Sequence, residues 1–268
     1  MSDEINYTSL GKRKILVAED VELNQYLARH IMESWGFEVE IANNGREALE
    51  MVTINTYDLV LMDIQMPEMD GMEATRNIRS LPDPLKASIP IVALTANTLK
   101  GDSERYISVG MNDYLAKPFD EPNLFLIISK NLSETGTVVS EDKLPASENV
   151  QPSADEKLYD LSMVEAISGG DQQFVKKMMQ LFLDTVPSAL VDIKAELKAE
   201  QWESLGKLAH KMKSTIDSMG ISSLKQDIRA IELNGKQQNS IPEIPQLVSK
   251  LVSVMEACMA QVKKDFSL

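Results

Sequence analysis

Short apolar runs alternate with longer amphipathic stretches between residues 12 and 132. The runs are rich in Val, Ile and Leu and read KILVAED, FEVEIA, YDLVLMD, IPIVALTA and DYLAKP. The stretches between them predict helices over 21–35, 44–54, 71–80, 98–109 and 120–132. Strands that are apolar along nearly their whole length are covered on both faces, as in a parallel sheet. The pattern therefore predicts a doubly wound, five-stranded α/β domain over residues 12–132.

The pattern changes after residue 132. Residues 133–157 contain no aromatic residue and are rich in Ser, Glu and Pro, which predicts a flexible acidic linker. Over residues 158–268 the apolar positions recur at helical spacing, which predicts an antiparallel four-helix bundle. The expected helices are 160–167, 171–186, 187–200, 201–218, 221–235 and 243–265. Pro187 is expected at the first position of the third of these, where proline is tolerated.

Composition narrows the class of protein. The chain has 268 residues, of which 43% are hydrophobic and 25% are charged, as in a soluble globular protein. No apolar run approaches the roughly 20 residues of a membrane span. A net charge of −14 argues against a nucleic-acid partner, which would require a basic face. Cys258 is the single cysteine and excludes an internal disulfide, so we expect a cytoplasmic protein.

Polar residues stand where the chain leaves four of the predicted strands. Glu19 and Asp20 end the first strand, Asp63 the third, Thr95 the fourth and Lys117 the fifth. The carboxyl ends of parallel strands share one edge of the sheet, where ligands bind. Three carboxylates at one edge repel one another unless a hard cation joins them, and oxygen-only ligands suit Mg²⁺. A polar residue at one strand end is ordinary, but the set predicts Asp63 as a nucleophile toward a phosphoryl group, with Thr95 and Lys117 near its oxygens.

The helix predicted over 201–218 carries one of the two histidines of the chain. Its apolar stripe is formed by Trp202, Leu205, Ala209, Met212, Ile216 and Met219. His210 lies about 130° from the centre of that stripe at about 100° per residue, which predicts that it faces water. Gly206 and Ser214, four residues before and after it, are expected to leave room there for a partner. The simpler alternative is a solvated histidine among lysines.

Residues 12–132 resemble a response-regulator receiver domain of two-component signalling. The ED that ends the first strand, LMDIQMPEMDG, LTAN and YLAKPF match that family in order and spacing. The resemblance implies that Asp63 accepts a phosphoryl group. It also implies that Glu19, Asp20 and Asp63 hold Mg²⁺ together with the backbone carbonyl of Gln65.

The same resemblance assigns residues at the other strand ends. Thr95 and Tyr114 match the pair that switches on phosphorylation, and Lys117 matches the catalytic lysine. The bond between Lys117 and Pro118 is expected to be cis, a geometry that proline permits.

The second half is similar to a histidine-phosphotransfer (HPt) domain. The similarity rests on YDLSMVEAISGGDQQFVKKMMQLFLDTVP and WESLGKLAHKMKSTIDSMGI. It implies that His210 carries a phosphoryl group, and Lys213 is expected to support the phosphate oxygens while Lys207 and Lys211 add basic charge. Ser214 departs from the usual glycine of the family, and we expect docking to be retained because serine is also small.

Together these features predict a phosphorelay protein. We expect its partners to be a histidine kinase or other receiver domains, with exchange between its own two domains also open. No ATP-binding segment of the kinase type is visible, so we expect the chain itself to be a phosphoryl carrier and leave open whether it is an enzyme. We also expect it to be part of a hybrid histidine kinase.

Two alternatives from other classes remain open. A Mg²⁺-dependent aspartyl-phosphate phosphatase would share the acid cluster, but it usually has a second acid at the position of Gln65. A structural dimerisation module would instead predict an exposed apolar face on the bundle.

Overall fold

The computed structural model describes residues 5–95, 102–132 and 157–268. Its sheet has the order β2-β1-β3-β4-β5, and every pair of neighbouring strands is parallel. The strands are β1 (Lys14–Ala18), β2 (Glu38–Ala42), β3 (Leu59–Asp63), β4 (Ile91–Thr95) and β5 (Asp113–Ala116). The predicted five-stranded α/β domain is therefore confirmed.

Both faces of this sheet are covered because alternate residues of the strands are apolar on both sides. On β3, Leu59 and Leu61 pack with one hydrophobic cluster, while Val60 and Met62 pack with a second. The helices that supply these two layers are α1 (Glu22–Ser34), α2 (Gly45–Ile54), α3 (Gly71–Arg79), α5 (Asp102–Ser108) and α6 (Glu121–Leu132). The helices α1 and α6 cover the first face, and α2 and α3 cover the other. A short helix that the sequence did not predict, α4 (Pro84–Ala87), follows α3.

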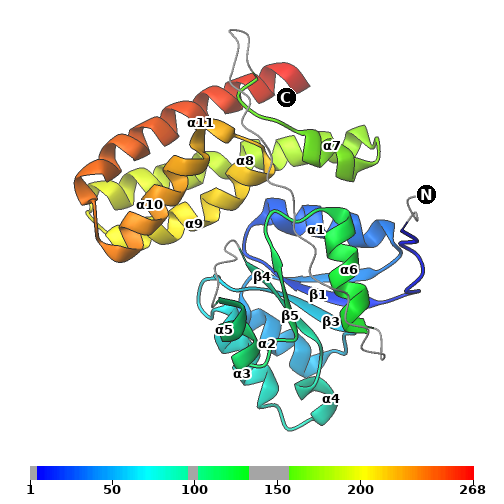
Figure 1. The fold of residues 1–268 in the computed structure, drawn as a ribbon. Coiled ribbons are helices and arrows are strands. Elements are labelled where there is room, and N and C mark those ends of the chain that lie inside the picture. The colour runs from blue at the N-terminus through cyan, green and yellow to red at the C-terminus, as the bar shows by residue number, and fades with distance from the viewer. Residues whose placement is uncertain (1–4, 96–101, 133–156) are drawn as a thin grey trace.

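The second half forms the predicted helical bundle (Figure 1). Its helices are α7 (Ser162–Ser168), α8 (Gln172–Lys198), α9 (Trp202–Ser218), α10 (Lys225–Gln237) and α11 (Ile244–Phe266), with short 3₁₀ turns η1 (Ser222–Leu224) and η2 (Ile241–Glu243). The expected break at Pro187 was wrong, because α8 runs continuously through that residue. Pro187 is exposed, whereas Val186, Leu190 and Ile193 carry the buried stripe past it. Burial along the whole helix therefore outweighs the one backbone hydrogen bond that proline cannot make.

Helices α9 and α10 approach each other closely. A Cβ on Gly206 would lie 3.0 Å from the backbone nitrogen of Lys236, and one on Gly235 would lie 2.7 Å from the backbone oxygen of Trp202. The spacing of Gly206 from His210 suggested that it leaves room for a partner domain. That expectation was wrong, because α10 fills the space beside Gly206. Instead, Gly206 brings α10 against the helix that carries His210.

The two domains contact each other through α1, which meets both α8 and α9 (Figure 1). The ring of Phe174 on α8 stacks on His30 with the centroids 3.8 Å apart, and on Tyr26 at 5.2 Å. His30, the other histidine of the chain, thus lies at the domain contact. The linker predicted over 133–157 lies outside the described residues, except for its last position. The first residues of the helix predicted over 98–109 lie outside them as well. Within the described ranges, no helix is both long and apolar enough to cross a membrane.

Candidate functional site

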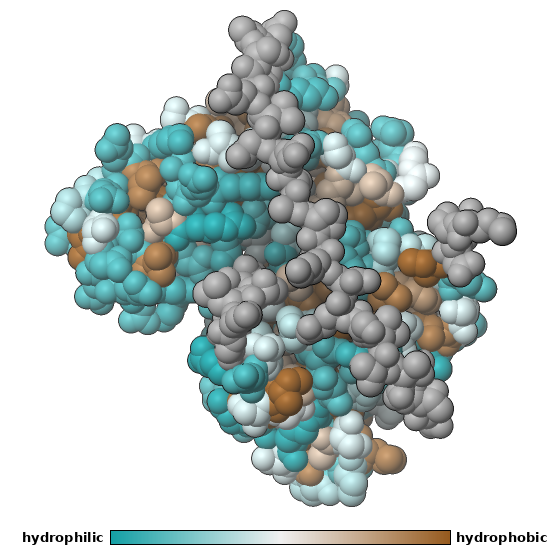
Figure 2. Space-filling model, viewed as in Figure 1, coloured by the Kyte–Doolittle hydropathy of each residue, from teal (hydrophilic) through white to brown (hydrophobic). Residues whose placement is uncertain are grey.

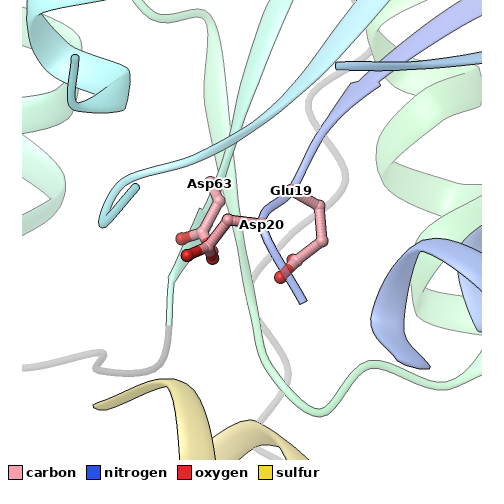
Figure 3. A group of neighbouring side chains, drawn as sticks. All are labelled: Glu19, Asp20 and Asp63. Carbon is pink, nitrogen blue, oxygen red and sulfur yellow. The ribbon is translucent and has the colours of Figure 1, made fainter. Parts of the chain in front are cut away.

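The carboxylates predicted at the strand ends converge in the structure. Glu19 and Asp20 follow β1 directly, and Asp63 is the last residue of β3, the neighbour of β1 in the sheet. One oxygen from each of the three side chains lies within 4.8 Å of the others. Figure 3 shows Asp20 and Asp63 side by side with Glu19 close to them. We call these three residues the acid cluster.

Lys117 enters the acid cluster from the end of β5. Its Nζ lies 2.6 Å from Oδ2 of Asp63 and also donates to Glu19, and only 8% of its side chain is exposed. Burial acts to lower the pKa of Lys117, but the charges of Asp63 and Glu19 outweigh burial and raise it. The side chain therefore stays protonated and neutralises part of the cluster.

The one lysine that the α/β domain itself supplies does not balance three carboxylates. Burial raises the pKa of Glu19 to about 7, because the charges of Asp63 and Asp20 add to the desolvation while Lys117 opposes it. Burial also raises the pKa of Asp20. Such a set of buried oxygen ligands carrying excess negative charge fits a hard divalent cation. The acid cluster is therefore suited to hold a metal ion.

Gln65 lies beside this cluster, since its backbone N–H donates to Oδ1 of Asp63 at 3.1 Å. Thr95 is buried, and its hydroxyl lies 3.0 Å from the hydroxyl of Tyr106 on α5. Tyr114, the predicted partner of Thr95 in switching, is half-buried on β5. The bond between Lys117 and Pro118 is cis, as the resemblance implied.

Sequence reasoning missed the part that Gly71 plays at this site. A Cβ at Gly71 would lie 2.0 Å from the backbone oxygen of Asp63, closer than any real contact. Its N–H also donates to the carbonyl of Ile64 at 3.1 Å. The first turn of α3 thus presses on the backbone of the predicted nucleophile, and only glycine permits that approach.

His210 is less exposed than its helical position predicted. Only 8% of the residue is accessible, because α10 and the receiver domain lie beside it. Its Nδ1 lies 2.6 Å from Oε1 of Glu232 on α10. The sequence gave no signal for Glu232, since the two residues are 22 positions apart and meet only through helix packing.

Three cationic or polar groups converge on Glu232. Besides His210, its carboxylate accepts from Nζ of Lys213 at 2.5 Å and from Nζ of Lys236 at 2.7 Å. Burial acts to raise the pKa of Glu232, but the hydrogen bonds from His210, Lys213 and Lys236 outweigh it and hold the pKa well below its usual range. The carboxylate is therefore ionised, so Nδ1 of His210 carries a proton and donates it. In the neutral imidazole, a proton on Nδ1 leaves the free electron pair on Nε2.

The other lysines near His210 have separate partners. Lys207 pairs with Glu203 on its own helix at 2.7 Å, whereas Lys211 reaches the receiver domain and lies 2.7 Å from Oδ2 of Asp20. Lys213 is buried rather than open to solvent. The basic surround predicted from sequence is thus divided between structural pairing and contact with the acid cluster.

The histidine site and the acid cluster face each other across the domain contact. Lys236 donates at 2.7 Å to Oε1 of Gln65 as well as to Glu232, so one side chain links the two sites. A small pocket between the domains is lined by Asn24 and Lys117 from the receiver and by Ser214 from α9. In Figure 3, the carboxylates of Asp20 and Asp63 point toward the yellow ribbon of the helical domain.

A doubly wound domain with an acid cluster at its strand ends, facing a histidine on a helical bundle, defines a phosphotransfer module of two-component signalling. Residues 15–129 match the family model of the response regulator receiver domain, and residues 177–265 match the model of the Hpt domain. The chain therefore belongs to the two-component phosphorelay proteins, with a receiver domain followed by an HPt domain.

The relatives are sensor kinases. The chain is 31% identical over 261 residues to the aerobic respiration control sensor protein ArcB of Escherichia coli K12, which covers 93% of this chain and 32% of that protein. It is 28% identical over 247 residues to the signal transduction histidine-protein kinase BarA of the same organism. That alignment covers 90% of this chain and 26% of BarA. The chain thus spans a third or less of the length of these relatives.

Among solved structures, the receiver domain of a sensor histidine kinase from Pseudomonas aeruginosa aligns with a TM-score of 0.42 and 38% identity. The alignment covers 46% of this chain and 98% of that one. That structure is described as having a magnesium ion in its active-site cleft.

Proposed function

We propose that Asp63 accepts a phosphoryl group in the presence of Mg²⁺ and that His210 receives it from Asp63. In this proposal the receiver domain is residues 12–132 and the HPt domain is residues 158–268. The observation that carries the proposal is the link through Lys236, which contacts Gln65 two residues after Asp63 and Glu232 beside His210. The two predicted phosphoryl carriers therefore belong to one continuous polar site.

The acid cluster would hold the metal through Glu19, Asp20 and Asp63, with the backbone carbonyl of Gln65 as a further ligand. When bound, Mg²⁺ would supply positive charge to the phosphoryl oxygens. Lys117 contributes a second, fixed charge, because it already contacts Asp63. We infer that Thr95 and Tyr114 act as the switch pair, and the hydroxyl of Tyr106 is in place to hold Thr95.

The hydrogen bond from His210 to Glu232 prepares the ring for transfer in this proposal, because it holds the proton on Nδ1. Nε2 attacks the phosphorus of the aspartyl phosphate, so that an N–P bond forms while the O–P bond breaks and Asp63 leaves as a carboxylate. The proton on Nδ1 stays in place, and the positive charge of the phosphorylated ring is offset by the carboxylate of Glu232. Lys213 donates to the same carboxylate, and in this proposal it also supports the phosphate oxygens.

Upstream and downstream partners follow from the chemistry and from the relatives. We infer that a histidine kinase phosphorylates Asp63, that a further receiver domain takes the group from His210, and that the relay runs on the cytoplasmic side. The kinship with ArcB and BarA supports placement within a hybrid histidine kinase. The comparisons do not favour the phosphatase alternative, and the visible face of the helical domain is mainly hydrophilic, which does not favour the dimerisation module (Figure 2).

The test is labelling of the full chain by acetyl phosphate. We expect wild type to be labelled only with Mg²⁺, and Asp63→Asn to lose all labelling because an amide is not a nucleophile. Asp113→Asn, at the start of β5, serves as the matched control and should label normally. His210→Gln should retain the alkali-labile acyl phosphate on Asp63 but lack the alkali-stable phosphohistidine. Undiminished labelling of Asp63→Asn would contradict the proposal.

A further inference from the structure

Lys211 brings a positive charge from the helical domain into the acid cluster of the receiver. Its Nζ lies 2.7 Å from Oδ2 of Asp20, and only 4% of the Asp20 side chain is exposed. Asp20 is also one of the three carboxylates whose oxygens converge within 4.8 Å. Lys211 thus acts from outside the receiver, whereas Lys117 neutralises Glu19 and Asp63 from within.

This ion pair is one part of a larger docking surface. On the receiver, the docking surface consists of Asp20, Tyr26, His30 and Gln65. Phe174 occupies the aromatic end by stacking on Tyr26 and His30, and Lys236 contacts Gln65 at the other end. The occupant is the HPt domain of the same chain, whose charge complements the acid cluster.

A metal ion in the acid cluster would need the same carboxylate. We propose that Lys211 and Mg²⁺ compete for Asp20, so that docking of the HPt domain and metal binding weaken each other. The inference rests on the proposed function insofar as that assigns Asp20 as a metal ligand. Two cations a few ångströms apart repel strongly where the surroundings are partly buried. Because linkage is reciprocal, the metal loosens docking by the same factor by which docking weakens metal binding.

The competition would select between partners. Without metal, Lys211 neutralises Asp20 and the HPt domain covers the cluster. With Mg²⁺ bound, the docking surface loses the ion pair between Lys211 and Asp20, while the stacking of Phe174 on Tyr26 and His30 remains. The metal-loaded receiver is therefore the form that opens most readily to the histidine of an outside donor.

The first experiment measures Mg²⁺ affinity of the full chain by calorimetry at constant ionic strength. Lys211→Gln removes the competing charge from a half-exposed side chain, and we expect it to bind Mg²⁺ about fivefold more tightly or better. Lys207→Gln is the matched control, because Lys207 lies on the same helix but pairs with Glu203. It should bind as wild type does. Equal affinity of Lys211→Gln and wild type would overturn the proposal.

A second variant tests whether docking delivers the charge. His30→Ala weakens the stacking on Phe174 but leaves Lys211 intact, so it should also bind Mg²⁺ more tightly than wild type. In the reciprocal experiment, Mg²⁺ should speed amide hydrogen exchange along 22–34 in wild type but not in Lys211→Gln. Unchanged affinity in His30→Ala, or exchange that ignores Mg²⁺ in wild type, counts against the inference. Absence of Mg²⁺ binding in every variant would instead overturn the metal site of the proposed function along with it.

Discussion

The acid cluster and the His210 site use the same kinds of side chain in opposite proportions. In the receiver, Lys117 pairs with two of the three carboxylates, Glu19 and Asp63, while Asp20 pairs with Lys211 of the helical domain, so two lysines face three carboxylates. In the helical domain, the single carboxylate of Glu232 is shared by two lysines and an imidazole. The first site is therefore short of positive charge and suits a metal ion, while the second has positive charge to spare and suits a phosphate anion without a metal.

The pKa directions reflect this difference. Glu19 is held above its usual pKa by burial and by its acidic neighbours, and Glu232 is held below by its hydrogen-bond donors in spite of burial. The comparison suggests how a metal-dependent acyl phosphate and a metal-independent phosphohistidine can stand within one polar site. In the proposed function, this difference in the balance of charge is what distinguishes the group that each domain carries.

The largest effect is expected from removing the internal cation of the receiver. Lys117→Ala leaves buried carboxylates facing one another, which should cost about 3–5 kcal/mol of receiver stability when a chelator is present. Added Mg²⁺ should restore part of that loss because it binds only the folded state. Urea unfolding with and without Mg²⁺ measures both quantities. A loss that Mg²⁺ leaves untouched would mean that Lys117 does not share its carboxylates with a metal.

The corresponding substitution in the helical domain removes the carboxylate of Glu232. Glu232→Ala leaves Lys213 buried without its carboxylate, and we expect a loss of about 3 kcal/mol in the helical domain. Unlike the receiver variant, it should not be rescued by Mg²⁺. Glu232→Gln retains an acceptor for Nδ1 of His210 and should lose less. If Mg²⁺ restored the stability of Glu232→Ala, the site around His210 would also bind the metal, which would contradict the difference between the two sites.

A smaller effect is expected from adding one methyl group beside Asp63. Gly71→Ala places a Cβ against the backbone oxygen of Asp63, so α3 must shift, at a cost of about 1–3 kcal/mol. Labelling by acetyl phosphate should slow as well, because the nucleophile moves. Gly11→Ala is a control of another kind, since its positive φ gives strain while no atom crowds its Cβ. Normal labelling and stability of Gly71→Ala would show that the close approach has no consequence.

The smallest effect is a pH dependence confined to the helical domain. The pKa of Glu232 is lower in the folded state than its unfolded value of about 4.3, so the folded state binds fewer protons. Its contribution to stability is complete above that value and is lost as the pH falls toward the folded pKa, by at most about 1.4 kcal/mol per pH unit. Between pH 4.5 and 3, the free energy of unfolding should fall less in Glu232→Gln than in wild type. The difference should correspond to the titration of about one carboxylate. Parallel pH curves for the two proteins would contradict this assignment.

Local pattern sufficed for all five strands, for most of the helices and for the polar residues at the strand ends of the receiver. The strands, the polar residues at their ends and the helix of His210 follow from periodicity, because parallel strands bring their carboxyl ends to one edge. Packing between distant segments could not be predicted in this way. Glu232 meets His210 through the contact of α9 with α10, and His30 meets Phe174 through the docking of two domains. The break predicted at Pro187 was wrong, because burial along the whole of α8 outweighs the tendency of proline to end a helix.

The central claim is that Asp63 passes its phosphoryl group to His210 across the contact seen here. The direct test is the initial rate of phosphohistidine formation in the full chain, followed by mass spectrometry after a pulse of acetyl phosphate with Mg²⁺. We predict that His210 is labelled after Asp63, that Asp63→Asn abolishes the signal, and that the first-order rate constant is the same at every protein concentration. Phosphohistidine that forms in Asp63→Asn, or a rate constant that rises with protein concentration, would contradict transfer within the chain.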